Sequence, residues 1–129
     1  MTNNLQKILI VEDELPMLNA LKDKLTAEGF QAIGAKNGQE GLDLALKEHP
    51  DLILLDIIMP KMDGITMMKN IRADLWGSKV PIIILSNLNP DNNVIKTIED
   101  NNPSFYLVKS DWNINDIVTK IRDLLNNRQ

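Results

Sequence analysis

Two short runs of almost purely apolar residues constrain the fold of this chain more than any other feature. They are KILIV at residues 7–11 and LILL at residues 52–55. Runs this short and this apolar are typical of strands buried on both faces, as in a parallel sheet. Three carboxylates follow directly, Glu12 and Asp13 after the first run and Asp56 after the second. If the two strands are neighbours, these carboxylates share the crevice at the carboxyl edge of the sheet, where ligands bind in open α/β sheets.

Amphipathic stretches alternate with apolar runs along the whole chain. Leu18, Leu21 and Leu25 recur at helical spacing, which is typical of a helix with one face in the core. Pro16 suits the first turn of this helix, and Gly29 suits a left-handed residue at its end. The pattern predicts strands at 7–11, 30–35, 52–55, 81–85 and 104–108, and helices at about 15–28, 38–48, 64–74, 91–101 and 112–126.

Two further helices show apolar faces that we expect to point into the core. In helix 38–48 the inward residues are Leu42, Ala45 and Leu46. In helix 112–126 one stripe is formed by Ile114, Ile117, Val118, Ile121, Leu124 and Leu125.

Regular alternation of strands and helices implies parallel strands joined by right-handed crossovers. The run at 30–35 is the least apolar and contains Gly34, which suits an edge strand, whereas the two most apolar runs suit the centre. We therefore predict an α/β fold, a single doubly wound five-stranded parallel sheet of order 2-1-3-4-5 with five helices. Residues 1–129 form one domain in this prediction, with a core at about 7–126 and polar tails at both ends.

Composition excludes several classes of protein. The net charge is −4 and the chain has no block of Lys or Arg, which argues against direct binding to nucleic acid. The absence of Cys excludes disulfides and thiolate metal sites. No apolar stretch approaches the roughly 18–20 residues of a membrane helix, and the N-terminus does not have the pattern of a signal peptide. We expect a cytoplasmic protein with no membrane partner.

Polar side chains end two further strands at the same edge of the predicted sheet. Ser86 follows the strand at 81–85, and Lys109 follows the strand at 104–108. Crowded carboxylates repel one another and favour a cation, and their hard oxygen atoms suit Mg²⁺. Asp56 beside the metal is placed as a nucleophile toward a phosphoryl group, whose charge Lys109 and Ser86 would stabilise. Each polar residue alone is ordinary at a strand end, but the ordered set indicates phosphoryl chemistry.

At this point the sequence resembles the receiver domain of two-component response regulators, over about residues 7–126. The resemblance rests on VED at 11–13, LLDIIMPKMDG at 54–64, LS at 85–86 and YLVK at 106–109. It implies a flavodoxin-like receiver fold and a signalling phosphoprotein rather than a turnover enzyme. It also implies that Asp56 accepts a phosphoryl group from a sensor histidine kinase or a phosphotransfer protein.

The resemblance further implies a role for each residue of the edge. Three carboxylates and one main-chain carbonyl would hold Mg²⁺, namely Glu12, Asp13, Asp56 and Ile58. Lys109 and Ser86 would contact the phosphoryl group, and Ser86 with Tyr106 would form the switch pair. The face made by helix 91–101, strand 104–108 and helix 112–126 would serve a downstream protein or a homodimer, with Lys120 and Arg122 as candidate charges.

Three positions depart from the family pattern. Ser110 stands after the lysine, where the family has a proline with a cis peptide bond, and a cis bond to a non-proline residue costs roughly 2.5–4 kcal/mol. Asn87 stands after the switch hydroxyl, where the family has Ala or Gly. The segment 101–103 does not have the usual Gly-Ala turn. None of these departures removes a member of the catalytic set.

Two other functions remain as alternatives from the sequence. A phosphatase of the haloacid dehalogenase type also forms an aspartyl phosphate, but it needs a second Asp two residues after the nucleophile, where this chain has Ile58. A flavin- or nucleotide-binding module needs a loop rich in Gly, Ser or Thr after the first strand, where this chain has the acidic EDELPM. Since no output domain follows the last predicted helix, we expect a stand-alone receiver or a receiver from a longer chain.

Overall fold

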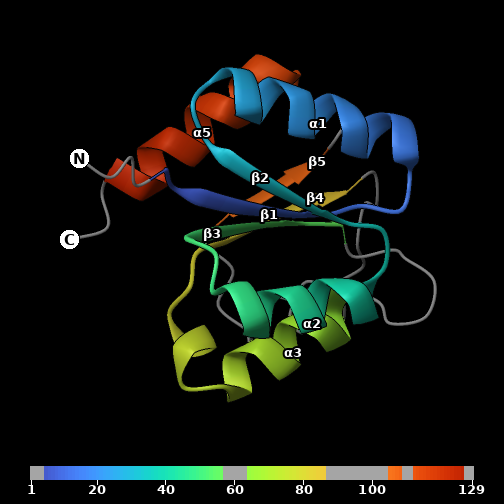
Figure 1. The fold of residues 1–129 in the computed structure, drawn as a ribbon, viewed down its shortest axis with the longest axis vertical. Coiled ribbons are helices and arrows are strands. Elements are labelled where there is room, and N and C mark those ends of the chain that lie inside the picture. The colour runs from blue at the N-terminus through green and yellow to red at the C-terminus, as the bar shows by residue number, and fades with distance from the viewer. Residues whose placement is uncertain (1–4, 57–63, 87–104, 109–111, 127–129) are drawn as a thin grey trace.

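The computed structural model describes residues 5–56, 64–86, 105–108 and 112–126 (Figure 1). The strands are β1 (Lys7–Val11), β2 (Gln31–Ala35), β3 (Leu52–Leu55), β4 (Ile82–Ser86) and β5 (Phe105–Val108). The helices are α1 (Leu15–Ala27), α2 (Gly38–Glu48), α3 (Gly64–Ala73) and α5 (Ile114–Asn126), with a short 3-10 helix η1 (Trp76–Ser78). All strand pairs are parallel and the order is β2-β1-β3-β4-β5, which confirms the predicted fold class. The helix predicted at 91–101 lies outside the described residues.

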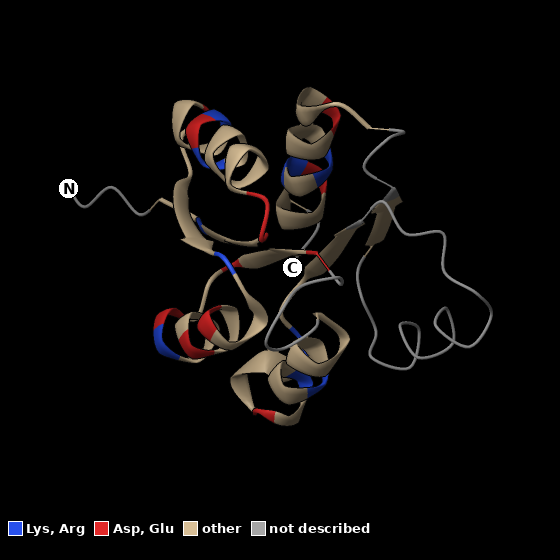
Figure 2. Cartoon of the chain, turned by 90° about the vertical axis from the view of Figure 1, so that its right-hand side faces the viewer, with Lys and Arg blue, Asp and Glu red and all other residues tan. Residues whose placement is uncertain are grey.

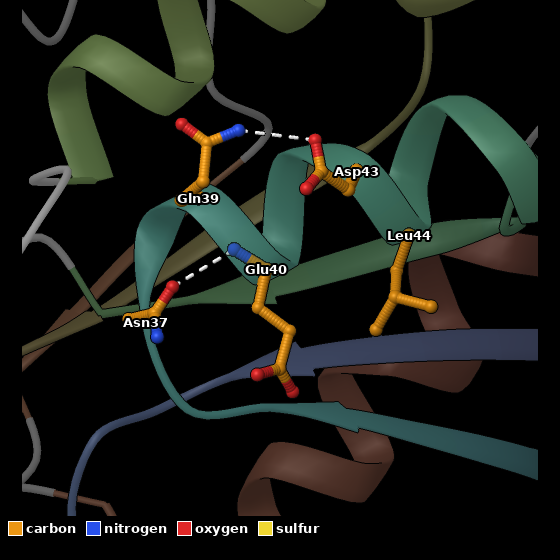
Figure 3. A pocket seen from close by; sticks show the side chains of 5 residues that line it. All are labelled: Asn37, Gln39, Glu40, Asp43 and Leu44. Atoms are coloured by element: carbon orange, nitrogen blue, oxygen red, sulfur yellow. Dashed lines mark hydrogen bonds between the residues drawn. The ribbon is translucent and has the colours of Figure 1, made fainter.

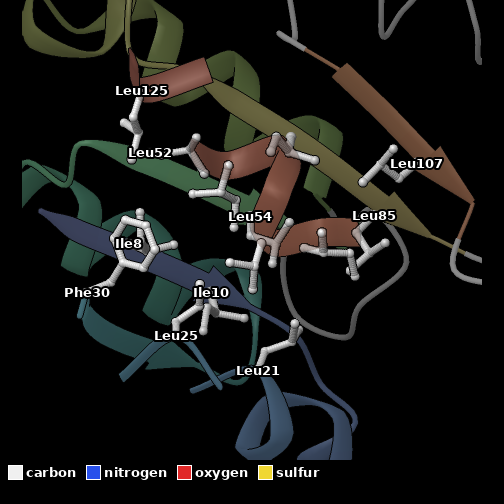
Figure 4. Packing of buried hydrophobic residues seen from close by; sticks show 14 of the residues in the cluster. Ile8, Ile10, Leu21, Leu25, Phe30, Leu52, Leu54, Leu85, Leu107 and Leu125 are labelled. Carbon is white, nitrogen blue, oxygen red and sulfur yellow. The ribbon is translucent and has the colours of Figure 1, made fainter. Parts of the chain in front are cut away.

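Helices cover both faces of the sheet (Figure 1), and an apolar layer lies between the sheet and the helices on each face. Ile8 and Ile10 of β1 belong to the layer under α1 and α5, which we call the α1/α5 core (Figure 4). Leu9 and Val11 belong to the layer under α2 and α3, the α2/α3 core. Because helices cover both faces, successive side chains of a central strand are all buried, which explains why its sequence shows no alternation of apolar and polar residues.

The predicted inward face of α2 is wrong at one position. Leu46 is 39% exposed, and the buried residues of α2 are Gly38, Gly41 and Ala45. A Cβ atom on Gly41 would lie 2.8 Å from Val11 Cγ2, so the helix backbone lies directly against β1. The glycine face packs because it has no side chains, and the helix is therefore turned so that Leu46 points outward.

Element ends follow local chemistry. Gly29 has φ +95° just beyond α1, which confirms the predicted left-handed residue. Strand β4 begins at Ile82 rather than at Pro81, whose ring has no N–H to donate to the sheet. Helix α5 begins two residues later than predicted, because the Asn113 side chain accepts a hydrogen bond of 2.9 Å from Asp116 N and so caps the first turn. Within the described residues, no helix has the length and apolar character needed to cross a membrane.

A tight corner connects α3 to β4. The half-buried Arg72 donates from Nη1 to Gly77 O at 2.8 Å and to Val80 O at 2.7 Å. Burial lowers the pKa of this guanidinium from its ordinary value. Gly77 is pressed against α3, since a Cβ atom there would collide with the main-chain oxygen of Ile71. The corner therefore depends on one residue without a side chain and on one cation that bonds to two carbonyl groups.

A long-range contact joins α5 to the end of α1. Arg122 Nη2 donates to Glu28 O at 2.8 Å and to Glu28 Oε1 at 3.0 Å, and its guanidinium lies 5.0 Å from the centre of the Phe30 ring. The hydrogen bond from Arg122, followed by that from Lys24, lowers the pKa of Glu28 below its ordinary value of 4.5. Lys120 Nζ lies 4.1 Å from the centre of the Phe105 ring. The two α5 cations suggested for a dimer face thus already have partners within the chain.

Gly77→Ala tests the corner. The new methyl group has no space against the Ile71 carbonyl, so we expect the free energy of unfolding in urea to fall by about 2 kcal/mol or more. Lys79→Ala, at an exposed position in the same connection, is the control and should change it by less than about 0.5 kcal/mol. Equal stability of the two variants would contradict the tight packing at Gly77.

Glu28→Gln tests the link between α5 and α1. A folded-state pKa below the unfolded value means that the charged carboxylate stabilises the fold above pH 4.5, and that this stability is lost as pH falls through the folded pKa. We expect the variant to be less stable than the wild type near neutral pH, with the difference closing in acid. Chemical denaturation across this range measures it, with Asp123→Asn on the exposed side of α5 as the control. A difference that does not vary with pH would contradict the assignment.

Candidate acidic site at the carboxyl edge of the sheet

Main-chain pairing aligns the ends of the central strands. Val11 pairs with Leu55, and Asp56 N donates to Val11 O at 3.0 Å. On the other side of β1, Glu12 N donates to Ala35 O at 3.0 Å. The first residue after β1 and the first residue after β3 are therefore neighbours, which confirms the predicted adjacency of the two strands.

The three predicted carboxylates come together at this edge. Each of Glu12, Asp13 and Asp56 offers a carboxylate oxygen that lies within 4.8 Å of those of the other two. Glu12 is 2% exposed and Asp56 is 6% exposed, whereas Asp13 is open to solvent. Glu12 Oε1 also accepts a hydrogen bond of 3.2 Å from Glu14 N, which shapes the turn into α1. Figure 2 looks toward this edge and shows the acidic segment entering α1 between the two helical layers.

The donor set fits a hard divalent cation. All the donor atoms are carboxylate oxygens, and two of the three side chains are buried, so their mutual repulsion is poorly screened by water. Oxygens on opposite sides of an octahedral Mg²⁺ lie about 4.2 Å apart. Carboxylates within 4.8 Å of one another can reach one such ion after a small closing movement or through a bridging water.

Two of the other predicted site residues, Ser86 and Tyr106, lie within the described residues. Ser86 is the last residue of β4 and pairs with Val108 on β5. Tyr106 is half-buried on β5, pairs with Ile84 and packs against the α2/α3 core. Two predicted members of the site, Ile58 and Lys109, lie outside the described residues, as do the departures at Asn87, 101–103 and Ser110.

A shallow cavity of about 570 Å³ lies elsewhere, at the start of α2. Its lining contains none of the predicted site residues and consists of Asn37, Gln39, Glu40, Asp43 and Leu44 (Figure 3). Sequence reasoning missed Asn37, a buried polar residue whose Oδ1 accepts a hydrogen bond of 2.8 Å from Glu40 N. The signal was present, since a capping residue followed by Glu three positions later is typical of a helix start.

The chain matches the family described as "Response regulator receiver domain" over residues 8–122. Among curated proteins, it is 42% identical over 88 residues to "Probable transcriptional regulator ycf27" of Porphyra purpurea, covering 68% of this chain and 35% of that protein. It is 32% identical over 99 residues to "Response regulator PleD" of Caulobacter vibrioides, covering 77% of this chain and 22% of that protein. The chain therefore spans about a third or less of the length of these relatives.

Solved structures show the same architecture. A CheY-like receiver domain protein from Methanospirillum hungatei has a TM-score of 0.88 at 25% identity, with 95% of each chain covered. The BeF3-activated N-terminal receiver domain of RstA from Klebsiella pneumoniae has a TM-score of 0.82 at 28% identity, with 96% of this chain and 100% of that chain covered. The match to the family extends through β1 and β3, and so includes the acids at their ends. This chain belongs to the response regulator receiver domain family of two-component signalling proteins.

Proposed function

We propose that the chain is a phospho-acceptor switch in which Asp56 receives a phosphoryl group from a histidine kinase or a phosphotransfer protein. Phosphoryl acceptance is general for the family. The observation that supports it here is the meeting of Glu12, Asp13 and Asp56 within 4.8 Å at the carboxyl edge of the sheet. Two of these carboxylates are buried, and Asp56 directly follows the central strand, where its backbone is held by β1.

Each residue then has a distinct role. Glu12, Asp13, Asp56 and the main-chain carbonyl of Ile58 would hold Mg²⁺, and the bound ion would neutralise negative charge on the nucleophile and the phosphoryl group. A carboxylate oxygen of Asp56 attacks phosphorus, a new O–P bond forms, and the N–P bond to the donor histidine breaks. Lys109 and Ser86 contact the phosphoryl oxygens and stabilise their charge.

The product is an acyl phosphate that changes a binding surface. Ser86 moves toward the new charge and Tyr106 follows, which alters the face formed by β5, α5 and the helix predicted at 91–101. A downstream protein binds this face. A homodimer through the same face is the second candidate. Lys120 and Arg122 already have contacts within the chain, since each lies against an aromatic ring of its own chain and Arg122 also pairs with Glu28.

We propose that residues 1–129 form a single receiver unit with a core at 7–126. Receiver domains are signalling domains and in general not turnover enzymes. We propose that this chain is likewise a switch and not a turnover enzyme, and that it acts in the cytoplasm. The relatives are longer than the matched region, and one of them is named a transcriptional regulator.

Asp56→Asn tests the acceptor. The amide cannot form the acyl phosphate, so labelling by acetyl phosphate with Mg²⁺ should fall from near one phosphoryl group per chain to background. Asp23→Asn, an exposed acid on α1, is the control and should label as the wild type does. Intact-protein mass spectrometry measures the label. Stoichiometric labelling of Asp56→Asn would show that another residue is the acceptor.

Asp13→Asn tests the cation site. Removing one of three crowded charges should raise the free energy of unfolding in metal-free buffer by up to about 1 kcal/mol. The wild type should gain about 2.7 kcal/mol when free Mg²⁺ is 100 times its dissociation constant, and Asp13→Asn should gain clearly less at the same Mg²⁺ concentration. Thermal unfolding with and without Mg²⁺ measures both effects, again with Asp23→Asn as the control. Equal stabilisation of Asp13→Asn and wild type by Mg²⁺ would exclude Asp13 as a ligand.

A further inference from the structure

The chain contains one Asn–Gly pair, Asn37–Gly38, at the junction of β2 and α2. In such a pair the main-chain nitrogen of the glycine can attack the side-chain amide carbon of the asparagine. Glycine favours this attack because it has no side chain to shield its nitrogen and its backbone is the least restricted of all residues. By sequence alone, Asn37 is therefore the most reactive amide of this chain toward spontaneous deamidation.

The native structure holds both oxygens of Asn37 in hydrogen bonds. The side-chain Oδ1 accepts from Glu40 N at 2.8 Å (Figure 3), and the main-chain oxygen accepts from Gly41 N at 2.9 Å. The residue has φ −157° and ψ 170°, and only 8% of its surface is exposed. Gly38 is already the first residue of α2. The side-chain amide can turn toward Gly38 N only if the cap to Glu40 is broken.

We propose that Asn37 is a modification site for spontaneous deamidation, closed while the first turn of α2 is formed and reactive when this turn opens. In the reaction the Gly38 N–Asn37 Cγ bond forms and the Cγ–Nδ2 bond breaks. Ammonia leaves and carries away the proton of Gly38 N. Water then opens the five-membered imide at either carbonyl, giving aspartate or isoaspartate at position 37.

The two products have different consequences for α2. Aspartate keeps an oxygen that can accept from Glu40 N, and its negative charge suits the helix N-terminus. Isoaspartate lengthens the main chain by one methylene group and places the carboxylate differently, so the cap is lost. One turn further on, Gly41 packs against Val11 with no room for a Cβ atom. A shifted start of α2 therefore disturbs the layer directly under β1.

The unsubstituted chain tests this without any variant. We expect Asn37 to deamidate at least about tenfold more slowly in native buffer than in denaturing urea at the same pH and temperature. In the folded chain the reaction must first break the cap bond from Glu40 N and expose the buried Asn37 side chain, and breaking one helix cap alone has a cost of about this order. Peptide mapping by mass spectrometry locates the acidic and isoaspartyl products. Equal rates in the two conditions would show that the folded first turn of α2 does not protect Asn37. The absence of product at Asn37 in urea would show that Asn37 is not a reactive site.

Two variants test separately the protection of Asn37 by the folded turn and the attack of Gly38 N on its side chain. Glu40→Pro removes the N–H that holds Oδ1, at a position in the first turn of the helix, so the native rate should rise toward the rate in urea. Gly38→Ala shields the attacking nitrogen, so the rate in urea should fall several-fold. Circular dichroism checks that both variants fold. A native rate that is unchanged in folded Glu40→Pro, or a rate in urea that is unchanged in Gly38→Ala, would contradict the corresponding step.

Discussion

The pairing of β1 with β3 is the interaction on which the rest of this structure depends. Residues 8–11 of β1 lie beside residues 52–55 of β3, and all eight side chains are at most 1% exposed. A shift of one residue in this pairing would move every side chain of one strand to the other face of the sheet. The register is therefore fixed by burial, and the position of Glu12 beside Asp56 follows from it.

The free energy of the same burial offsets the repulsion between the acidic side chains. Two unit charges 4.8 Å apart repel by roughly 3–4 kcal/mol at an effective dielectric constant of about 20. Burying one large aliphatic side chain stabilises a fold by about 1.5–3 kcal/mol. Two of the eight buried side chains of the central strands thus offset the repulsion within the buried pair. A site with net negative charge can therefore persist at this edge without a cation, and the proposed Mg²⁺ would lower its free energy further.

Much of this architecture could be predicted from the sequence, because burial on both faces leaves short apolar runs that no polar residue interrupts. The bounds of β1, β3 and α2 were predicted correctly, and so were the strand order and the meeting of the three acids. The acids could be predicted to meet because the carboxyl ends of parallel strands all lie at the same edge of the sheet. Ile58 and Lys109 stay predictions, since they lie outside the described residues.

The features that could not be predicted from the sequence depend on contacts between distant residues or on glycine, which has no side chain. Leu46 was placed inward by its spacing, but the close approach of Gly41 to β1 decides how α2 is turned. His49 stacks on Trp76 with ring centres 4.6 Å apart and planes 6° from parallel, which joins the end of α2 to η1. Neither contact leaves a periodic pattern in the sequence, because the first is created by the packing of a helix on a strand and the second by the packing of one helix end on another helix.

The two-layered core also limits how a change at Asp56 can reach a partner. Tyr106 packs in the α2/α3 core, whereas its neighbour Leu107 packs in the α1/α5 core. Strand β5 pairs only with β4 among the described strands, so it is an edge strand that can shift without breaking the central pair. Ser86 and Val108 pair at the end of these two strands. In the proposed switch, a movement at Ser86 is therefore transmitted along the β4–β5 side of the sheet, while β1 and β3 keep the acids in place.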